Sequence, residues 1–142
     1  MTTAIETLSS AILRPKECPV PQHILLVEDS RTQALRFQLV LARHGLMVEI
    51  ASNGDRAMAA VRDRQPAAII LDIDLPDTTG YQLCRTIKEN PTTAQIPVVM
   101  LTHRDAANDA LEGLQVGAED YIPKDSFAEQ NLVESLRQLG IL

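Results

Sequence analysis

Four acidic residues stand at the ends of two apolar runs of the chain. Glu28 and Asp29 follow the run ILLV, while Asp72 and Asp74 lie in the stretch AIILDIDLPDTTG at residues 68–80. A carboxylate that closes a buried strand is costly unless a cation or a donor pairs with it. Grouped carboxylates suit a hard divalent cation, and a carboxylate left free could act as a nucleophile.

Two further polar residues end apolar runs later in the chain. Thr102 closes PVVMLT, and Lys124 follows YIP. Three carboxylates in one pocket repel each other, and Mg²⁺, or Mn²⁺ in its place, would relieve that repulsion. With a hydroxyl and an ammonium group beside it, such a pocket meets the needs of phosphoryl transfer to Asp72. The cations would neutralise the phosphoryl oxygens while the carboxylate attacks in line.

The elements that must position these residues alternate between apolar runs and segments with helical periodicity. We expect strands at about 24–27, 46–51, 67–72, 97–102 and 119–122, and helices at about 30–44, 55–64, 79–89, 105–117 and 127–139. Apolar strands joined by helices indicate an α/β fold, a doubly wound parallel sheet with helices on both faces. Ligands bind such sheets beyond the carboxyl ends of the strands, so the order 2-1-3-4-5 brings the polar residues together.

The periodicity also predicts which residues of two helices face the sheet. The first helix has one apolar stripe and a glycine stop, formed by Leu35, Leu39, Ala42 and Gly45. The third helix turns three residues inward: Leu83, Cys84 and Ile87.

Length and composition limit the number of domains and the functional classes that the chain can belong to. A chain of 142 residues suits one domain, which we place at 23–142 after a Pro-containing extension or linker at 1–22. The net charge of −6 and the lack of a basic stripe argue against nucleic-acid binding. No apolar run approaches the roughly 18 residues of a membrane span. Without a signal peptide or metal-type cysteine spacing, a cytoplasmic location is expected.

From about residue 23 to 142 the chain resembles the receiver domain of two-component response regulators, the CheY-like family. The acidic pair Glu28-Asp29, then Asp72, Thr102 and Lys124 occur in the family's order, with spacings of 30 residues from Asp72 to Thr102 and 22 from Thr102 to Lys124. Pro76 and Gly80 after Asp72, and VGAEDYI before the lysine, also follow the family pattern.

The resemblance implies a metal site and a phosphoacceptor. Asp72 would accept the phosphoryl group and contribute to Mg²⁺ binding. Asp29 would hold the metal directly, Glu28 directly or through water, and the main-chain carbonyl of Asp74 would be a further ligand.

The resemblance also implies a switch and partners. Thr102 and Lys124 would contact the phosphoryl group, and Tyr121 would change rotamer when Thr102 shifts. The fourth helix, fifth strand and fifth helix, at about 105–139, would form the output face and could support a weak homodimer. The donor would be a histidine kinase or phosphotransfer protein, and the target a downstream protein. The chain would catalyse only its own phosphorylation and dephosphorylation. We expect no output domain within these residues, and the chain could be a stand-alone receiver, an intermediate in a relay or a fragment of a hybrid kinase.

Three positions depart from the family pattern. Asp125 stands where the family usually has a proline that often follows a cis bond. A non-proline cis bond costs about 3–4 kcal/mol, so we expect either a trans bond after Lys124 or stored strain. His103 is bulkier than the usual residue and could restrict access to the acceptor. Asp74 and Arg104 would flank the pocket mouth, and we hypothesise that they form an ion pair there that screens the acyl phosphate from water.

Other functional classes fit less well. A pseudo-receiver that binds partners without phosphorylation would not need all of these pocket residues. LDIDLPD resembles the nucleophile motif of haloacid-dehalogenase-type phosphatases, but that motif opens the chain in that family. A flavodoxin-like FMN site would need a phosphate cradle where EDSRTQ places carboxylates.

Overall fold

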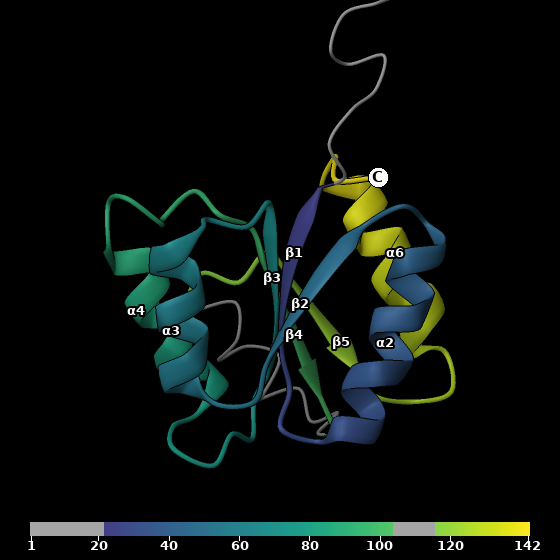
Figure 1. The fold of residues 1–142 in the computed structure, drawn as a ribbon, viewed down its shortest axis with the longest axis horizontal. Helices are drawn as coiled ribbons and strands as arrows, with labels where there is room; N and C mark the ends of the chain where they lie inside the picture. The colour runs from purple at the N-terminus through teal and green to yellow at the C-terminus, as the bar shows by residue number, and fades with distance from the viewer. Residues whose placement is uncertain (1–21, 104–115) are drawn as a thin grey trace, which may run out of the picture.

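Five parallel strands form one sheet with helices on both faces (Figure 1). The computed structural model describes residues 22–103 and 116–142. The elements there are β1 (His23–Val27), α2 (Arg31–Arg43), β2 (Met47–Ala51), α3 (Gly54–Asp63), β3 (Ala68–Asp72), α4 (Gly80–Glu89), β4 (Val98–Thr102), β5 (Asp120–Pro123) and α6 (Ala128–Gln138). The strand order β2-β1-β3-β4-β5 confirms the predicted fold class. Most of the extension at 1–22 and of the helix expected at 105–117 lies outside the described residues.

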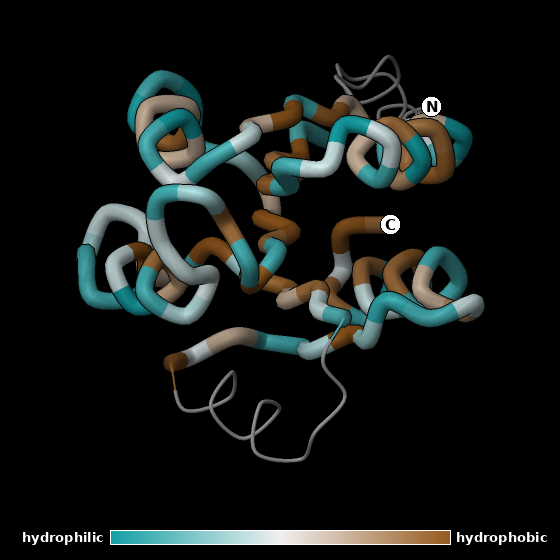
Figure 2. Tube along the Cα trace, turned by 90° about the horizontal axis from the view of Figure 1, so that it is seen from below, coloured by the Kyte–Doolittle hydropathy of each residue, from teal (hydrophilic) through white to brown (hydrophobic). Residues whose placement is uncertain are grey.

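Each face of the sheet has its own core because strand side chains alternate between the faces. Leu25 and Val27 of β1 join the cluster that packs under α3 and α4, whereas Ile24 and Leu26 join the cluster under α2 and α6. Figure 2 shows the apolar residues gathered between the helices, with hydrophilic residues on the outer sides of the helices. β1, β3 and β4 are buried along their whole length, as expected for the inner strands of a covered parallel sheet.

Polar side chains cap three helices close to the carboxyl ends of the strands. Ser30, Asn53 and Thr79 each accept a hydrogen bond from the backbone N–H three residues later. These bonds satisfy amides that have no partner inside the helix. Gly45, with φ +83°, follows α2 as predicted, in a conformation that glycine adopts without steric cost.

The predicted apolar stripe of α2 is wrong. Leu35 and Leu39 are 43% and 60% exposed, and Ala42 is also exposed. The buried residues are Ala34, Phe37 and Leu41, which pack with side chains of α6. Both stripes have helical spacing, and the one carrying the Phe37 ring faces the sheet. In α4 the prediction is confirmed, because all three inward-facing residues are buried: Leu83, Cys84 and Ile87.

The helices that the structure describes are 10 to 13 residues long. Within residues 22–103 and 116–142, none is both long and apolar enough to cross a membrane.

Candidate functional site

The carboxyl ends of the strands bring the predicted residues to one edge of the sheet. Glu28 and Asp29 follow β1, Asp72 ends β3, Thr102 ends β4 and Lys124 follows β5. The strand arrows of β4 and β5 point to the lower end of the molecule in Figure 1. Since β1, β3, β4 and β5 are successive neighbours in a parallel sheet, their ends meet there.

The Lys124 ammonium bridges two buried carboxylates. Lys124 Nζ donates a hydrogen bond to Glu28 Oε1 over 2.5 Å and lies 3.2 Å from Asp72 Oδ1. The three side chains are at most 5% exposed. The second carboxylate oxygen of Glu28 accepts from the backbone N–H of Ser30 over 3.2 Å. Lys124 is therefore fixed beside Asp72 by a partner from a different strand.

Asp72 is held in an environment that disfavours its charge. Burial, and next the neighbouring Glu28 carboxylate, raise the pKa of Asp72 from 3.8 to about 6, although the Lys124 ammonium acts in the opposite direction. One positive charge thus does not compensate the acidic cluster fully. An additional cation at this position would favour the ionised carboxylate that nucleophilic attack requires.

The acidic residues of the site fit a divalent metal ion. One oxygen each from Glu28, Asp29 and Asp72 can be chosen so that all lie within 4.8 Å of one another. Asp72 Oδ1 is buried, and the Lys124 ammonium 3.2 Å away is its only charged partner among the described residues. Asp29, in contrast, is exposed, so a metal bound there could keep water ligands. Carboxylate oxygens with room for water are the donor set that Mg²⁺ and Mn²⁺ accept.

Thr102, the last residue of β4, and Lys124, the residue after β5, are neighbours at the edge of the sheet. Thr102 is fully buried, and its carbonyl oxygen accepts from the backbone N–H of Lys124 over 2.6 Å. The Lys124–Asp125 peptide bond is trans, one of the two alternatives predicted. Asp125 Oδ1 accepts from the backbone N–H of Phe127 over 2.8 Å, at the beginning of α6. The missing proline therefore does not remove Lys124 from the site.

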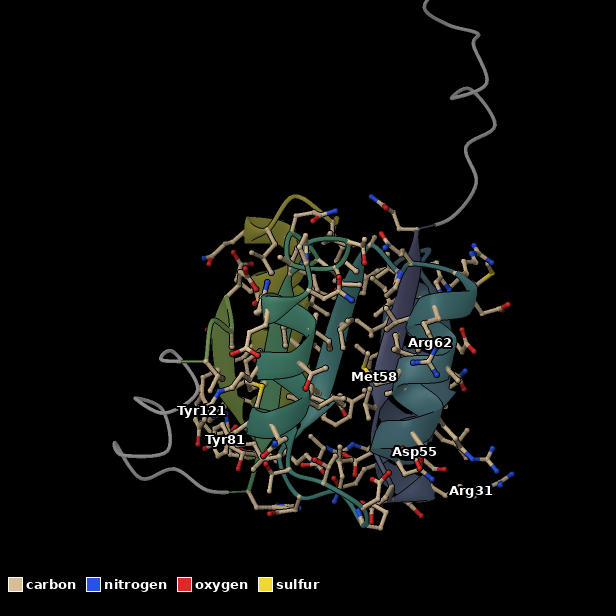
Figure 3. All side chains as sticks on the ribbon, turned by 90° about the vertical axis from the view of Figure 1, so that its left-hand side faces the viewer. Arg31, Asp55, Met58, Arg62, Tyr81 and Tyr121 are labelled. Atoms are coloured by element: carbon tan, nitrogen blue, oxygen red, sulfur yellow. The ribbon has the colours of Figure 1, made fainter. Side chains whose placement is uncertain are left out.

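The structure describes three further residues that were predicted to switch or to restrict access: Tyr121, His103 and Asp74. Tyr121 of β5 is half-buried against the core under α3 and α4, on the side shown in Figure 3. His103 is exposed and lines a pocket of about 360 Å³ together with Lys124 and Asp125. Asp74 is exposed after β3. Arg104 lies outside the described residues, so its ion pair with Asp74 stays a prediction.

Two features of the site were missed by sequence reasoning. The first is the bond between Lys124 and Glu28, because the sequence predicts Glu28 only as a metal ligand. The second is Asp77, in the loop between β3 and α4, whose two carboxylate oxygens accept from the backbone N–H groups of Gly54 and Asp55. Neither contact has a sequence signal, since each joins side chains and backbone that are far apart in the chain.

Comparison with known proteins places this geometry in a family. Residues 24–137 match the family described as response regulator receiver domain. The response regulator MprA of Mycobacterium sp. (strain KMS) is 33% identical over 120 residues, which are 84% of this chain and 51% of that protein. The chain thus spans about half the length of the curated relatives it matches.

Solved structures agree in fold. The signal receiver domain of a signal transduction histidine kinase from Syntrophus aciditrophicus is 35% identical with a TM-score of 0.76, over 83% of this chain and 89% of that one. The Mn²⁺-bound form of response regulator Rcp1 is 28% identical with a TM-score of 0.74, over 85% and 95%. The chain belongs to the family of response regulator receiver domains.

Proposed function

We propose that residues 23–142 act as a phosphorylatable receiver in which Asp72 accepts a phosphoryl group from a histidine kinase or phosphotransfer protein. The observation that carries the proposal is the contact of Asp72 with Lys124 inside a cluster of three carboxylates. A lysine and a metal site on either side of one carboxylate supply the positive charge that phosphoryl transfer needs.

The chemistry follows from the position of the acceptor. An oxygen of Asp72 attacks the phosphorus of a phosphohistidine, the P–N bond breaks, and its electron pair returns to the imidazole. The product is an acyl phosphate on Asp72, which water later hydrolyses to the free carboxylate and inorganic phosphate. Lys124 and the hydroxyl of Thr102 contact the transferred oxygens. In this proposal the chain catalyses only these reactions on itself.

The metal ligands are assigned from the same cluster. Asp29 and Asp72 would hold Mg²⁺ or Mn²⁺ directly and Glu28 directly or through water. The main-chain carbonyl of Asp74, which follows β3, would be a further ligand. The metal supplies charge neutralisation for the phosphoryl oxygens when bound. The exposure of Asp29 and Asp74 supports this assignment, because the metal must remain accessible to water and to the incoming phosphoryl group.

Signal output depends on residues beside the pocket. Thr102 moves toward the phosphoryl group, Tyr121 changes rotamer, and the face at about 105–139 presents a changed surface to a downstream protein or to a second copy of the chain. His103, Asp74 and Arg104 restrict access of water to the acyl phosphate. We place the chain in the cytoplasm, where a kinase of this class would reach it.

Labelling by a small phosphodonor tests the proposal. Acetyl phosphate with Mg²⁺ should add one phosphoryl group to the intact chain, detected by mass spectrometry, and chelation of Mg²⁺ should abolish the addition. Asp72→Asn should not be labelled, whereas Asp63→Asn, which alters an exposed acid at the end of α3, should behave as the wild type. Equal labelling of Asp72→Asn, or no labelling of the native chain, would contradict the proposal and favour a pseudo-receiver.

A further inference from the structure

The loop at residues 73–79, between β3 and α4, contacts the beginning of α3 through one side chain. Asp77 Oδ1 accepts from the backbone N–H of Gly54 over 2.8 Å, and Oδ2 accepts from that of Asp55 over 3.0 Å. These amides belong to the first turn of α3, where no helical carbonyl is available. Asn53, the capping residue, accepts from a different amide, that of Arg56. Asp77 thus completes the cap of a helix that is more than 20 residues away in the chain.

The loop and the helix are also closely packed at this contact. A Cβ atom added to Gly54 would lie 2.6 Å from Thr78 Cγ2 and 3.3 Å from Asp77 Oδ1. A side chain at position 54 would therefore force Thr78 or the loop to shift away from α3. The loop and α3 are therefore held together both by the hydrogen bonds of Asp77 and by close packing.

The other end of the loop is closed against β3. Gly80 N–H donates to the carbonyl of Ile73 over 2.7 Å, and Asp74 pairs with Thr79 in an isolated antiparallel bridge. The backbone of Asp74 therefore belongs to the closed base of the loop, three residues before the Asp77 anchor. Figure 3 shows Asp55, on the first turn of α3, at the same end of the molecule as Tyr81 at the beginning of α4.

Asp77 keeps its charge in this position. The hydrogen bond from the Gly54 amide is the main cause that lowers the pKa of Asp77 below 3.8. A carboxylate offers two acceptor oxygens, whereas an asparagine side chain offers one oxygen and a donor group that repels an N–H. The contact consequently requires aspartate for both bonds.

We propose that Asp77 is a positioning residue for the metal site, which anchors the 73–79 loop on α3 and so fixes the main-chain carbonyl of Asp74 for Mg²⁺. The inference rests on the proposed function, because that function assigns the Asp74 carbonyl to the metal. Asp77 does not touch the metal or the phosphoryl group. Groups that orient metal ligands typically contribute about 10- to 100-fold to metal affinity.

The test is Mg²⁺ affinity measured by calorimetry on the whole chain. Asp77→Ala should bind Mg²⁺ about tenfold more weakly than the wild type. The matched control is Asp55→Asn, which removes a negative charge at the same helix end but leaves the backbone N–H that Asp77 accepts. Its affinity should stay within about twofold of the wild type, because screened surface charges contribute little. Asp77→Asn, with one acceptor oxygen, should lie between them.

Hydrogen exchange in the wild type gives a second test that needs no variant. If the anchor strengthens metal binding, then metal binding must strengthen the anchor to the same extent, since coupling between sites is reciprocal. Mg²⁺ should therefore slow amide exchange at Gly54 and Asp55 by a larger factor than it slows exchange in α6, on the other face of the sheet, where only the general stabilisation of the fold acts. A purely structural cap would change the stability of the chain but would give equal slowing at both places and an unchanged Mg²⁺ affinity.

The possible failures are distinguishable. A wild-type chain that binds no Mg²⁺ would overturn the proposed metal site and this inference together. Equal Mg²⁺ affinities of Asp77→Ala and Asp55→Asn, or exchange at Gly54 and Asp55 slowed by Mg²⁺ no more than exchange in α6, would overturn the role of Asp77 alone. If Asp77→Ala does not fold, the affinity of Asp77→Asn and the exchange measurement decide.

Discussion

Lys124 donates its 2.5 Å hydrogen bond to Glu28, not to the phosphoacceptor candidate Asp72, which lies 3.2 Å away. The bond joins the end of β1 to the end of β5 across the two strands between them. Glu28 thereby has two functions in the site: it contributes an oxygen to the acidic cluster, and it orients the ammonium group toward Asp72. The carboxylate of Glu28 also raises the pKa of Asp72.

The raised pKa of Asp72 predicts that Asp72→Asn stabilises the metal-free chain at neutral pH. With a folded pKa of about 6 against 3.8 unfolded, the folded state favours protonated Asp72. The stability this gives is fully present below pH 3.8 and is lost as the pH rises through about 6. At about pH 7.5 the variant should exceed the wild type by about 2–3 kcal/mol in unfolding free energy.

Urea unfolding in the presence of a chelator measures this difference. The advantage of Asp72→Asn should vanish as the pH approaches about 4, where the native aspartate is also neutral. Asp63→Asn, an exposed acid, should stay within about 0.5 kcal/mol of the wild type at both pH values. A difference between Asp72→Asn and wild type that does not depend on pH would show that the native Asp72 carboxylate is not disfavoured in the fold.

Mg²⁺ should stabilise the wild-type chain, because a ligand that binds only the folded state shifts the unfolding equilibrium. At a concentration 100 times its dissociation constant, the gain is about 2.7 kcal/mol, and removal of the metal by EDTA should reverse it. Asp29→Asn should lose most of this gain, since it removes the exposed carboxylate of the cluster. Thermal unfolding with and without Mg²⁺ measures both. An equal Mg²⁺ effect in Asp29→Asn would exclude Asp29 as a ligand.

The buried face of α2 can be tested by two leucines. Leu41 is fully buried, whereas Leu39 is 60% exposed. Leu41→Ala should cost about 2–5 kcal/mol of unfolding free energy because it leaves a cavity, while Leu39→Ala should cost less than about 1 kcal/mol. Chemical denaturation of the two variants compares them directly. Similar losses would mean that Leu39 is covered in solution.

The sequence predicts the fold well because its strands are short, continuous apolar runs with polar residues at their carboxyl ends. It fails for α2 because two apolar stripes share the helical period. Periodicity alone cannot decide which stripe faces the sheet. In the structure Phe37 and Leu41 face the sheet and pack with side chains of α6. This packing depends on residues about 90 positions later in the chain.

The site is predictable to a similar extent. The strand ends predict that Asp72, Thr102 and Lys124 converge, because the topology alone brings these backbone positions together. They do not predict that Lys124 donates its shorter hydrogen bond to Glu28 and not to Asp72. That choice depends on side-chain geometry, including the bond between Glu28 and the Ser30 amide. The Asp77 anchor has no sequence signal for the same reason.

Gly80 should not tolerate a methyl group, because the backbone of β3 occupies the space next to it. A Cβ at Gly80 would lie 2.4 Å from the carbonyl oxygen of Asp72 and 2.8 Å from Ile73 Cα. Backbone atoms cannot move aside as a flexible side chain can, so Gly80→Ala should cost more than about 2 kcal/mol in unfolding free energy. It should also weaken Mg²⁺ binding, since we expect the clash to be relieved by a shift of the Asp72 backbone.

The matched control is Gly45→Ala, where nothing lies within 4 Å and only the positive φ is unfavourable, at about 1–2 kcal/mol. Denaturation and Mg²⁺ calorimetry on both variants decide: an unchanged Mg²⁺ affinity in a destabilised Gly80→Ala chain would mean that the clash is relieved in α4 and not at the acceptor.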